Sequence, residues 1–416
     1  MTTSPTSVPQ APGRPSSVPQ APGRLVTVAV LLVASMTIMA NATIAPSLPG
    51  LKAHFADAEG IETLSGLILT LPSLSVILTA GLFGYLADRM DRRLLLALAT
   101  GIYAIGGGSG LVAETLPQLL MGRLLLGIGV AGSMTLAMAF AADLWQGEAR
   151  ARFMGLQGAS MSGGGVVVML LGGALAALHW RGAFGVYLLA LPISALALTA
   201  LWPYARRAQA PVPVAGDRTP VSFPWPTFAF VGGLSFLFMA TFYVMPTRVP
   251  FRLAEIGVTN SAIVGLVMAG VMVTSVPGAL MYGKIRRFLS EMAVFAGSFA
   301  LMGVGLFTVS QAGSIWGVAI GGLIAGAGMG PAMPNYSTYL MAKVPPAARG
   351  RAAGLLTTSF FAGQFASPLV SAPLVANFGI SGAFLALSGA LLVIGTALAL
   401  RALQEASGRR RAWADV

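Results

Sequence analysis

The sequence predicts an all-α membrane protein in which 12 transmembrane helices form two six-helix bundles. Hydrophobic residues make up 56% of the 416 residues and charged residues only 9%, whereas soluble proteins contain about 25% charged residues. The apolar residues gather in runs of about 20, the length that crosses the hydrocarbon core of a bilayer. Motifs from the first half of the chain also recur in the second half.

Twelve apolar runs are long enough to be membrane spans. They are residues 25–47, 62–87, 94–113, 116–141, 153–177, 183–203, 225–247, 260–283, 289–310, 314–341, 352–377 and 381–400. The connections between most of them are short, so neighbouring helices must run antiparallel. An even number of spans places both ends of the chain on the same side of the membrane.

The segments outside the spans divide the chain into domains. Residues 1–24 contain the octapeptide Ser-Val-Pro-Gln-Ala-Pro-Gly-Arg twice, a composition typical of a disordered tail. Residues 205–223 form a polar, proline-containing linker between the sixth and seventh spans. We therefore expect six-helix bundles at 25–204 and 224–400, followed by a second tail at 401–416.

A charged hairpin at Gly84–Arg93 sets the orientation. It places five charges between two long apolar runs, and charged side chains are costly inside the hydrocarbon. Lys and Arg in short loops mark the cytoplasmic side, and most of the 25 Lys and Arg residues fall on the side of this hairpin. We expect the hairpin, the linker and both termini to lie in the cytoplasm. The net charge of +12 then reflects topology, not a nucleic-acid surface.

Three blocks of sequence recur at nearly the same separation. The matched residues are Gly84 with Gly278, Arg92 with Arg286, Arg93 with Arg287, Gly127 with Gly326, Gly129 with Gly328, Arg150 with Arg349, and Gly182 with Gly382. The chain is therefore predicted to be an internal duplication of a six-helix unit.

Enzyme chemistry finds no support in the sequence. The chain has no cysteine, and His54 and His179 are too far apart in sequence to suggest a metal site. Residues 127–132 fit a dinucleotide-binding pattern but lie inside an apolar helix, where small residues instead allow close helix packing. We expect no cofactor and no metal.

The hairpin resembles the loop signature of the major facilitator superfamily: a glycine, Asp-Arg four residues later, then paired arginines. Asp91 stands where the family often has a second glycine. Residues 123–129 are similar to the family's arginine–glycine motif, with Leu126 in place of a frequent glutamine. Residues 168–173 keep the paired glycines of the drug:proton antiporter branch without its earlier glycine and proline.

This resemblance covers residues 25–400 and implies two bundles that rock about a central cavity. It also implies a monomeric transporter of a small-molecule substrate in the lipid bilayer, in a bacterial inner membrane. The cavity would be lined by spans one, four, seven and ten, with span eleven nearby. The candidate cavity residues are Asn41, Arg123, Phe238, Tyr243, Asn335, Tyr336 and Gln364. For Phe238, packing against lipid is an equal expectation.

Arg123 is the only Lys or Arg inside a predicted span, about 10 Å from its outer end. One interpretation is that it faces the solute pathway, as charges inside membranes often do. The other is that it braces neighbouring helices through backbone carbonyls.

The resemblance also implies that the hairpin latches one conformation. The latch residues would be Gly84, Asp88, Arg89, Arg92, Arg93, Asp143 and Arg150. Arg89 is the expected partner of Asp143. The alternative is a solvated loop that only sets topology.

All 13 carboxylates fall at or near loops or span ends. The five closest to the membrane are Glu62, Asp88, Glu114, Asp143 and Glu291. We expect any proton coupling to use Glu62, Asp88, Asp143 or Glu291. We expect efflux of drug-like or metabolite compounds. The alternatives are uptake or uncoupled facilitation of a small polar or anionic metabolite, and a sensor with a transporter fold that moves no solute.

Overall fold

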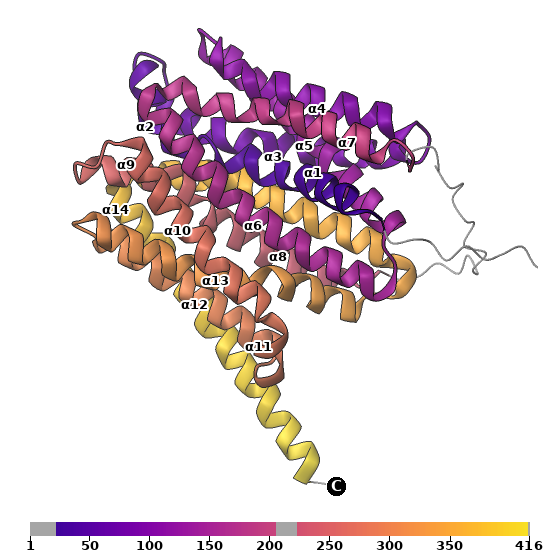
Figure 1. The fold of residues 1–416 in the computed structure, drawn as a ribbon. Helices are drawn as coiled ribbons and strands as arrows, with labels where there is room; N and C mark the ends of the chain where they lie inside the picture. The colour runs from indigo at the N-terminus through magenta and orange to yellow at the C-terminus, as the bar shows by residue number, and fades with distance from the viewer. Residues whose placement is uncertain (1–21, 205–222, 415–416) are drawn as a thin grey trace, which may run out of the picture.

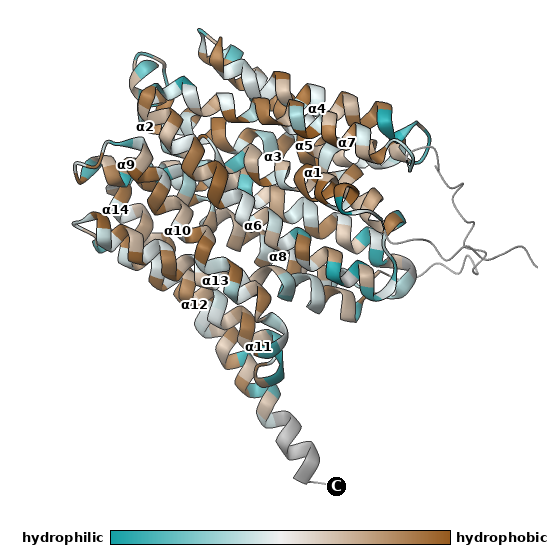
Figure 2. Ribbon diagram, viewed as in Figure 1, coloured by the Kyte–Doolittle hydropathy of each residue, from teal (hydrophilic) through white to brown (hydrophobic). Residues whose placement is uncertain are grey.

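The computed structural model describes residues 22–204 and 223–414. The predicted tail and linker lie almost wholly outside these ranges. Every regular element within them is a helix (Figure 1), which confirms the predicted all-α fold. Hydrophobic residues run along the helices and hydrophilic residues gather at their ends (Figure 2), as a membrane-spanning bundle requires.

The first half contains six crossings. Its helices are α1 (Arg24–Ala42) continued by η1 (Ala45–Ser47) and α2 (Leu48–His54), α3 (Ile61–Ala87), α4 (Arg92–Gly108) with η2 (Ser109–Leu111), α5 (Leu116–Leu144), α6 (Gly147–Leu178), and η3 (Trp180–Leu189) continued by α7 (Ala190–Leu201).

The second half contains the other six. Its helices are α8 (Trp225–Phe242) continued by α9 (Val244–Glu255), α10 (Ser261–Leu280), α11 (Tyr282–Phe288), α12 (Glu291–Gln311), α13 (Ile315–Lys343), η4 (Pro346–Ala348) and α14 (Arg349–Ala414).

The long helix α14 holds two crossings because its backbone leaves the helical conformation at Gly379, with φ 69° and ψ 177°. Positive φ is readily adopted by glycine alone, so this residue divides the predicted spans eleven and twelve. The second part then continues as helix to Ala414. Residues 401–414, predicted as a tail, are therefore an extension of the last span.

The first and seventh spans are longer than predicted. Each is a 31-residue segment, Arg24–His54 and Trp225–Glu255, whereas the sequence placed their ends at 47 and 247. Lys52 and Arg248, which lie outside the predicted spans, fall inside these longer segments. The extension brings Asn41 to the middle of its span and places Arg248 inside one.

Glycines allow close packing within the first half. A side chain at Gly127 of α5 would collide with Pro72 of α3. Side chains at Gly129 and Gly132 would collide with α4, at Tyr103 and at Ala99. The packing interpretation of this glycine pattern is confirmed, and a dinucleotide loop is excluded here because the residues lie inside a helix.

The two halves pack against each other at one end of the molecule, and their contact extends to the middle, where Gly165 of α6 lies beside Met272 of α10. At this end α2 packs against α9, α3 against α14, and α6 against α10, and Figure 1 shows α2 and α9 side by side. We call this the closed end. At the opposite end, which carries the Gly84–Arg93 hairpin, a methyl group added to Gly84, Gly155 or Gly354 would meet no neighbouring side chain or helix. We call this the hairpin end.

Candidate functional site

A small polar cluster joins the two halves midway along their helices. Asn41 of α1 donates from Nδ2 to Oε1 of Gln364 in α14, at 3.4 Å. Ser73 of α3 donates from Oγ to the same oxygen, at 3.0 Å. One amide of the second half is thus held by two helices of the first. Tyr243, at the junction of α8 and α9, lies within hydrogen-bonding reach of Asn41. We call these four residues the central cluster.

The central cluster has unused hydrogen-bonding capacity. Among the described residues, the buried Oδ1 of Asn41 has no partner, and the same holds for Oγ1 of Thr37 and Oγ of Ser367. Thr37 lies one helical turn before Asn41, and Ser367 lies about one turn after Gln364. A buried polar atom without a partner costs about 1–3 kcal/mol. The free oxygen of Asn41 is therefore the point of the cluster where a polar group of a solute would bind favourably.

Two predicted cavity residues lie instead in the core of the second bundle. Phe238 and Tyr336 are fully buried, with their ring centroids 6.2 Å apart. The hydroxyl of Tyr336 donates to the backbone oxygen of Leu234 at 3.3 Å. This placement corrects the cavity expectation for both, and the lipid-facing expectation for Phe238. Hydropathy shows where a helix crosses the membrane. It does not show which face of the helix meets the cavity, because several faces of these helices are apolar.

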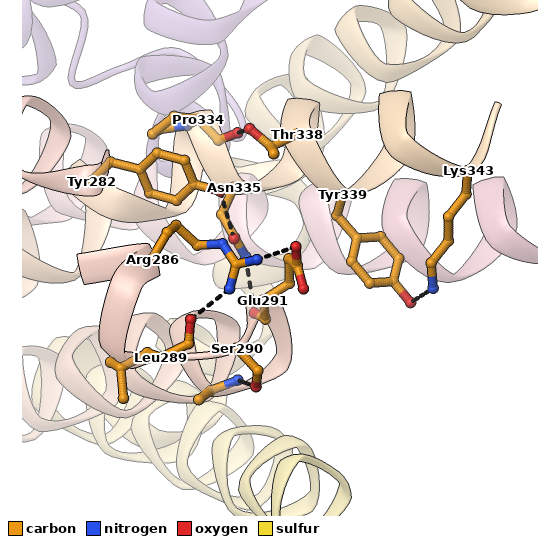
Figure 3. A network of polar contacts seen from close by, with 11 residues as sticks. Tyr282, Arg286, Leu289, Ser290, Glu291, Pro334, Asn335, Thr338, Tyr339 and Lys343 are labelled. Atoms are coloured by element: carbon orange, nitrogen blue, oxygen red, sulfur yellow. Dashed lines mark hydrogen bonds and ion pairs between the residues drawn. The ribbon is translucent and has the colours of Figure 1, made fainter. Parts of the chain in front are cut away.

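Asn335 also packs within the second bundle (Figure 3). Its Oδ1 accepts from the hydroxyl of Tyr282 at 3.0 Å, and its Nδ2 donates to the backbone oxygen of Glu291 at 3.0 Å. Glu291 forms an ion pair with Arg286. These contacts tie α11 and the start of α12 to α13, so Asn335 braces the second copy of the hairpin and does not join the central cluster.

Arg123 is enclosed by the first bundle. It is fully buried, and its Nη2 donates to the backbone oxygens of Gly106 and Gly107 at 3.2 and 2.9 Å. Its guanidinium carbon lies 4.9 Å from the ring centroids of Phe184 and Tyr187, a cation–π geometry. All of these contacts come from α4 and η3, so the geometry favours the brace over the solute pathway.

The hairpin is held by a different arginine from the one expected. Arg92, not Arg89, forms the ion pair with Asp143, because Arg92 begins α4 and lies against the end of α5. Arg89 stacks on the Tyr85 ring at 3.7 Å. Arg93 pairs with Asp91.

Two other predicted latch residues are free in this conformation. Asp88 and Arg150 are exposed, and neither forms an ion pair among the described residues. A latch made by Asp88 would therefore form only in another conformation of the protein.

At the closed end, a polar contact crosses between the halves. Arg248 of α9 is only 3% exposed. It donates from Nη1 to the backbone oxygen of Glu62 at 3.3 Å and from Nε to Oγ of Ser371 at 3.2 Å. The carboxylate of Glu62 pairs with Lys52.

The sequence reasoning missed Arg248. The buried residues Met245, Val249 and Leu253 recur every fourth position around it, and this helical period was the signal that could have extended the span.

The architecture and the pairing of the two halves agree with comparison to known proteins. The sequence profile described as Major Facilitator Superfamily matches residues 30–287 and 230–415. The chain belongs to the major facilitator superfamily. Its members are transporters, and the helices described here provide the apolar crossings that such a protein needs.

Among curated relatives, the class C tetracycline resistance protein of Escherichia coli is 28% identical over 385 residues, covering 88% of this chain and 92% of that protein. A triacylglyceride transporter of Mycolicibacterium smegmatis is 30% identical over 133 residues. That match covers 32% of this chain and only 23% of the mycobacterial protein. The tetracycline relative supports the resemblance to the drug:proton antiporter branch.

Solved structures show the same fold. A bacterial homologue of the human lysosomal transporter Spinster has a TM-score of 0.71 at 18% identity, covering 91% of this chain and 96% of that one. A D-xylose–proton symporter has a TM-score of 0.70 at 18% identity, covering 90% and 96%.

Proposed function

We propose that this chain exports drug-like or metabolite compounds across a bacterial plasma membrane by alternating access. The observation that carries the proposal is the central cluster, where Gln364 of one half is bonded to Asn41 and Ser73 of the other. A site shared by both halves is exposed to one side or the other as the halves rock. The full-length similarity to a tetracycline resistance protein supports export.

Orientation follows from the charges. With the hairpin end in the cytoplasm, the closed end, where the two halves pack together, faces outward, and we infer that the solute pathway opens to the cytoplasm. A solute for export would enter from that side and reach the central cluster. Both termini would then be cytoplasmic, and the protein would work as a monomer.

The chemistry of the central cluster favours an uncharged polar or amphipathic solute. Its residues are two amides, a hydroxyl and a phenol, and none of them carries a charge. Amides both donate and accept hydrogen bonds, so carbonyl, hydroxyl and amide groups of a solute can bind. Met36 and Met39 precede Asn41 in the first span, and Phe242 precedes Tyr243 in the seventh. Such side chains suit an apolar body.

Glu62 is the best candidate for proton coupling. A coupling carboxylate must change its surroundings between conformations, and Glu62 lies where the halves meet at the closed end. Its side chain pairs with Lys52 of its own half, and its backbone oxygen accepts from Arg248 of the other. Asp143 and Glu291 form ion pairs within one half, so domain movement alone would not break those pairs.

A flux assay tests the proposal. Inverted membrane vesicles carrying the protein should accumulate tetracycline or an amphipathic dye when their interior is made acidic. Right-side-out vesicles should instead extrude it. Accumulation of a small polar metabolite by right-side-out vesicles would indicate uptake. Absence of saturable flux for every compound in both orientations would indicate a sensor.

A further inference from the structure

A cavity of about 400 Å³ lies at the closed end, outside the central cluster. Its wall combines Lys52 of α2 and Glu62 of α3 with Arg248 and Phe251 of α9 and Ile380 of α14. Both halves of the protein therefore contribute to it. We call it the closed-end pocket.

The closed-end pocket carries one cation, Arg248, that has no ion pair of its own and shares the attraction of the Glu62 carboxylate with Lys52. Of its four charged residues, Lys52 is paired with Glu62, and Glu255 is paired with Arg252, which lies outside the wall. Arg248 forms no ion pair within the part of the chain that the structure describes. The four wall residues sum to zero, but with Arg252, which neutralises Glu255, the five residues together carry one net positive charge.

The guanidinium of Arg248 has a free donor. Nε and Nη1 are bonded to Ser371 and to the backbone of Glu62, but Nη2 is buried and has no partner among the described residues. The residue is 97% buried, being 3% exposed. A buried charge with an open donor is costly, and an anionic acceptor would form a strong charge-assisted hydrogen bond with it.

Apolar side chains complete the wall. Phe251, Val375 and Ile380 lie beside the charged residues, so a ligand that fits must have an apolar part next to its charged group. The one net positive charge of the five charged residues matches a ligand with one negative charge. This composition distinguishes the pocket from the uncharged central cluster.

We propose that the closed-end pocket is a second binding site, which takes a small amphipathic monocarboxylate with its carboxylate on Arg248. The site goes beyond the proposed transport function, since it lies apart from the central cluster. Because the walls come from both halves, a bound carboxylate stabilises the conformation in which the closed end is shut. External monocarboxylates should therefore slow the transport cycle.

Binding can be measured without transport, because the chain has no cysteine. Ala254 lines the pocket, so Ala254→Cys provides a reporter in the full-length purified protein. The rate at which N-ethylmaleimide labels it is measured with octanoate, with octan-1-ol and with octyltrimethylammonium at equal concentration. We expect octanoate to slow labelling several-fold and the other two compounds to have little effect.

Variants locate the charge that is responsible. In Arg248→Gln, the octanoate concentration that gives half-maximal protection should rise at least about tenfold, because a hydrogen bond to a charged group is lost. Arg248→Lys should keep part of it. Arg181→Gln is the matched control, because Arg181 is bonded to the backbone of Ala113 near the same end of the first half but lies outside the pocket wall, and it should leave protection unchanged. Ser407→Cys, an exposed reporter near the end of α14, should show no protection at all.

Equal protection by all three compounds would overturn the proposal, because the pocket would then be merely apolar. Absence of protection by octanoate, or full protection in Arg248→Gln, would also overturn it. If Arg248→Gln fails to fold, the comparison of the three compounds in Ala254→Cys with Arg248 unchanged still shows whether the pocket prefers a carboxylate. None of these outcomes depends on transport, so they leave the proposed function to be judged by flux.

Discussion

Asn41 and Gln364 join the two halves of the protein through a hydrogen bond of 3.4 Å, midway along the spans to which they belong. They are 323 residues apart in the chain. Each belongs to a helix that packs mainly against helices of its own half. Ser73 strengthens the junction by donating to the same amide oxygen. A solute that binds here must interact with these groups, and movement of the halves must rearrange them.

Gln364→Ala should therefore reduce transport strongly without unfolding the protein. The substitution removes the shared acceptor, and we expect at least a tenfold loss of kcat/KM from hydrogen bonds that bind the solute. Gln404→Ala, an exposed glutamine on the same helix, is the matched control. Flux into inverted vesicles at equal protein level measures both. Full activity in Gln364→Ala would remove the central cluster from the solute pathway.

Arg123→Ala should destabilise the first bundle and impair transport of all solutes alike. The side chain donates to two backbone oxygens of α4 and lies against two aromatic rings, so its loss should cost about 2–4 kcal/mol. Thermal unfolding, followed by intrinsic fluorescence, should show a Tm several degrees lower. Arg123→Lys should restore part of the loss because it keeps the charge but not the planar fork. A stable Arg123→Ala protein that rejects only anionic solutes would contradict the bracing role.

The positions of the spans followed from the sequence far better than their rotations did. The predicted span 62–87 differs by one residue from α3, Ile61–Ala87, because hydropathy reports where a helix crosses the membrane. Tyr336 and Asn335 were placed on the cavity, yet they face their own bundle. Apolar residues cover more than one face of such a helix, so the pattern alone does not show which face meets the other half.

Charged residues near span ends were the other source of error. Arg248 was assigned to a loop one residue beyond its predicted span, although the helix continues to Glu255. The structure shows that its charge is tolerated because Ser371 and the backbone of Glu62 accept its hydrogen bonds. Those partners come from distant parts of the chain and leave no local signal.

Asp88→Asn should slow transport while leaving expression and thermal stability nearly unchanged. Asp88 is exposed and forms no ion pair among the described residues here, so removing one surface charge should alter stability by less than about 1 kcal/mol. The substitution would remove a contact that Asp88 makes only when the hairpin end closes. Initial rates of efflux at matched protein levels measure the effect. An unchanged rate would reduce the hairpin to a signal for topology.

Glu62→Gln should make flux insensitive to an imposed pH gradient. Its carboxylate is 59% exposed and paired with Lys52 where the halves meet, so it can exchange protons with the solution when the closed end rearranges. Asp88→Asn, Asp143→Asn and Glu291→Gln serve as comparisons, and each should keep gradient-driven flux. If all four variants remain fully gradient-dependent, protons are carried by another group.

Alternating access requires the closed end to open, and a reversible cross-link tests this requirement most directly. Gly66 of α3 and Pro368 of α14 face each other across the halves, since a Cβ added at Gly66 would lie 2.8 Å from that of Pro368. Two cysteines there are close enough to form a disulfide after a small shift. Gly303→Cys with Leu392→Cys, a pair in contact within the second half, is the control.

The measurement is efflux by the Gly66→Cys, Pro368→Cys protein before and after oxidation, and again after reduction with dithiothreitol. We predict that oxidation abolishes transport, that reduction restores it, and that the control pair transports in both states. Undiminished transport by a fully cross-linked protein would contradict alternating access through this interface.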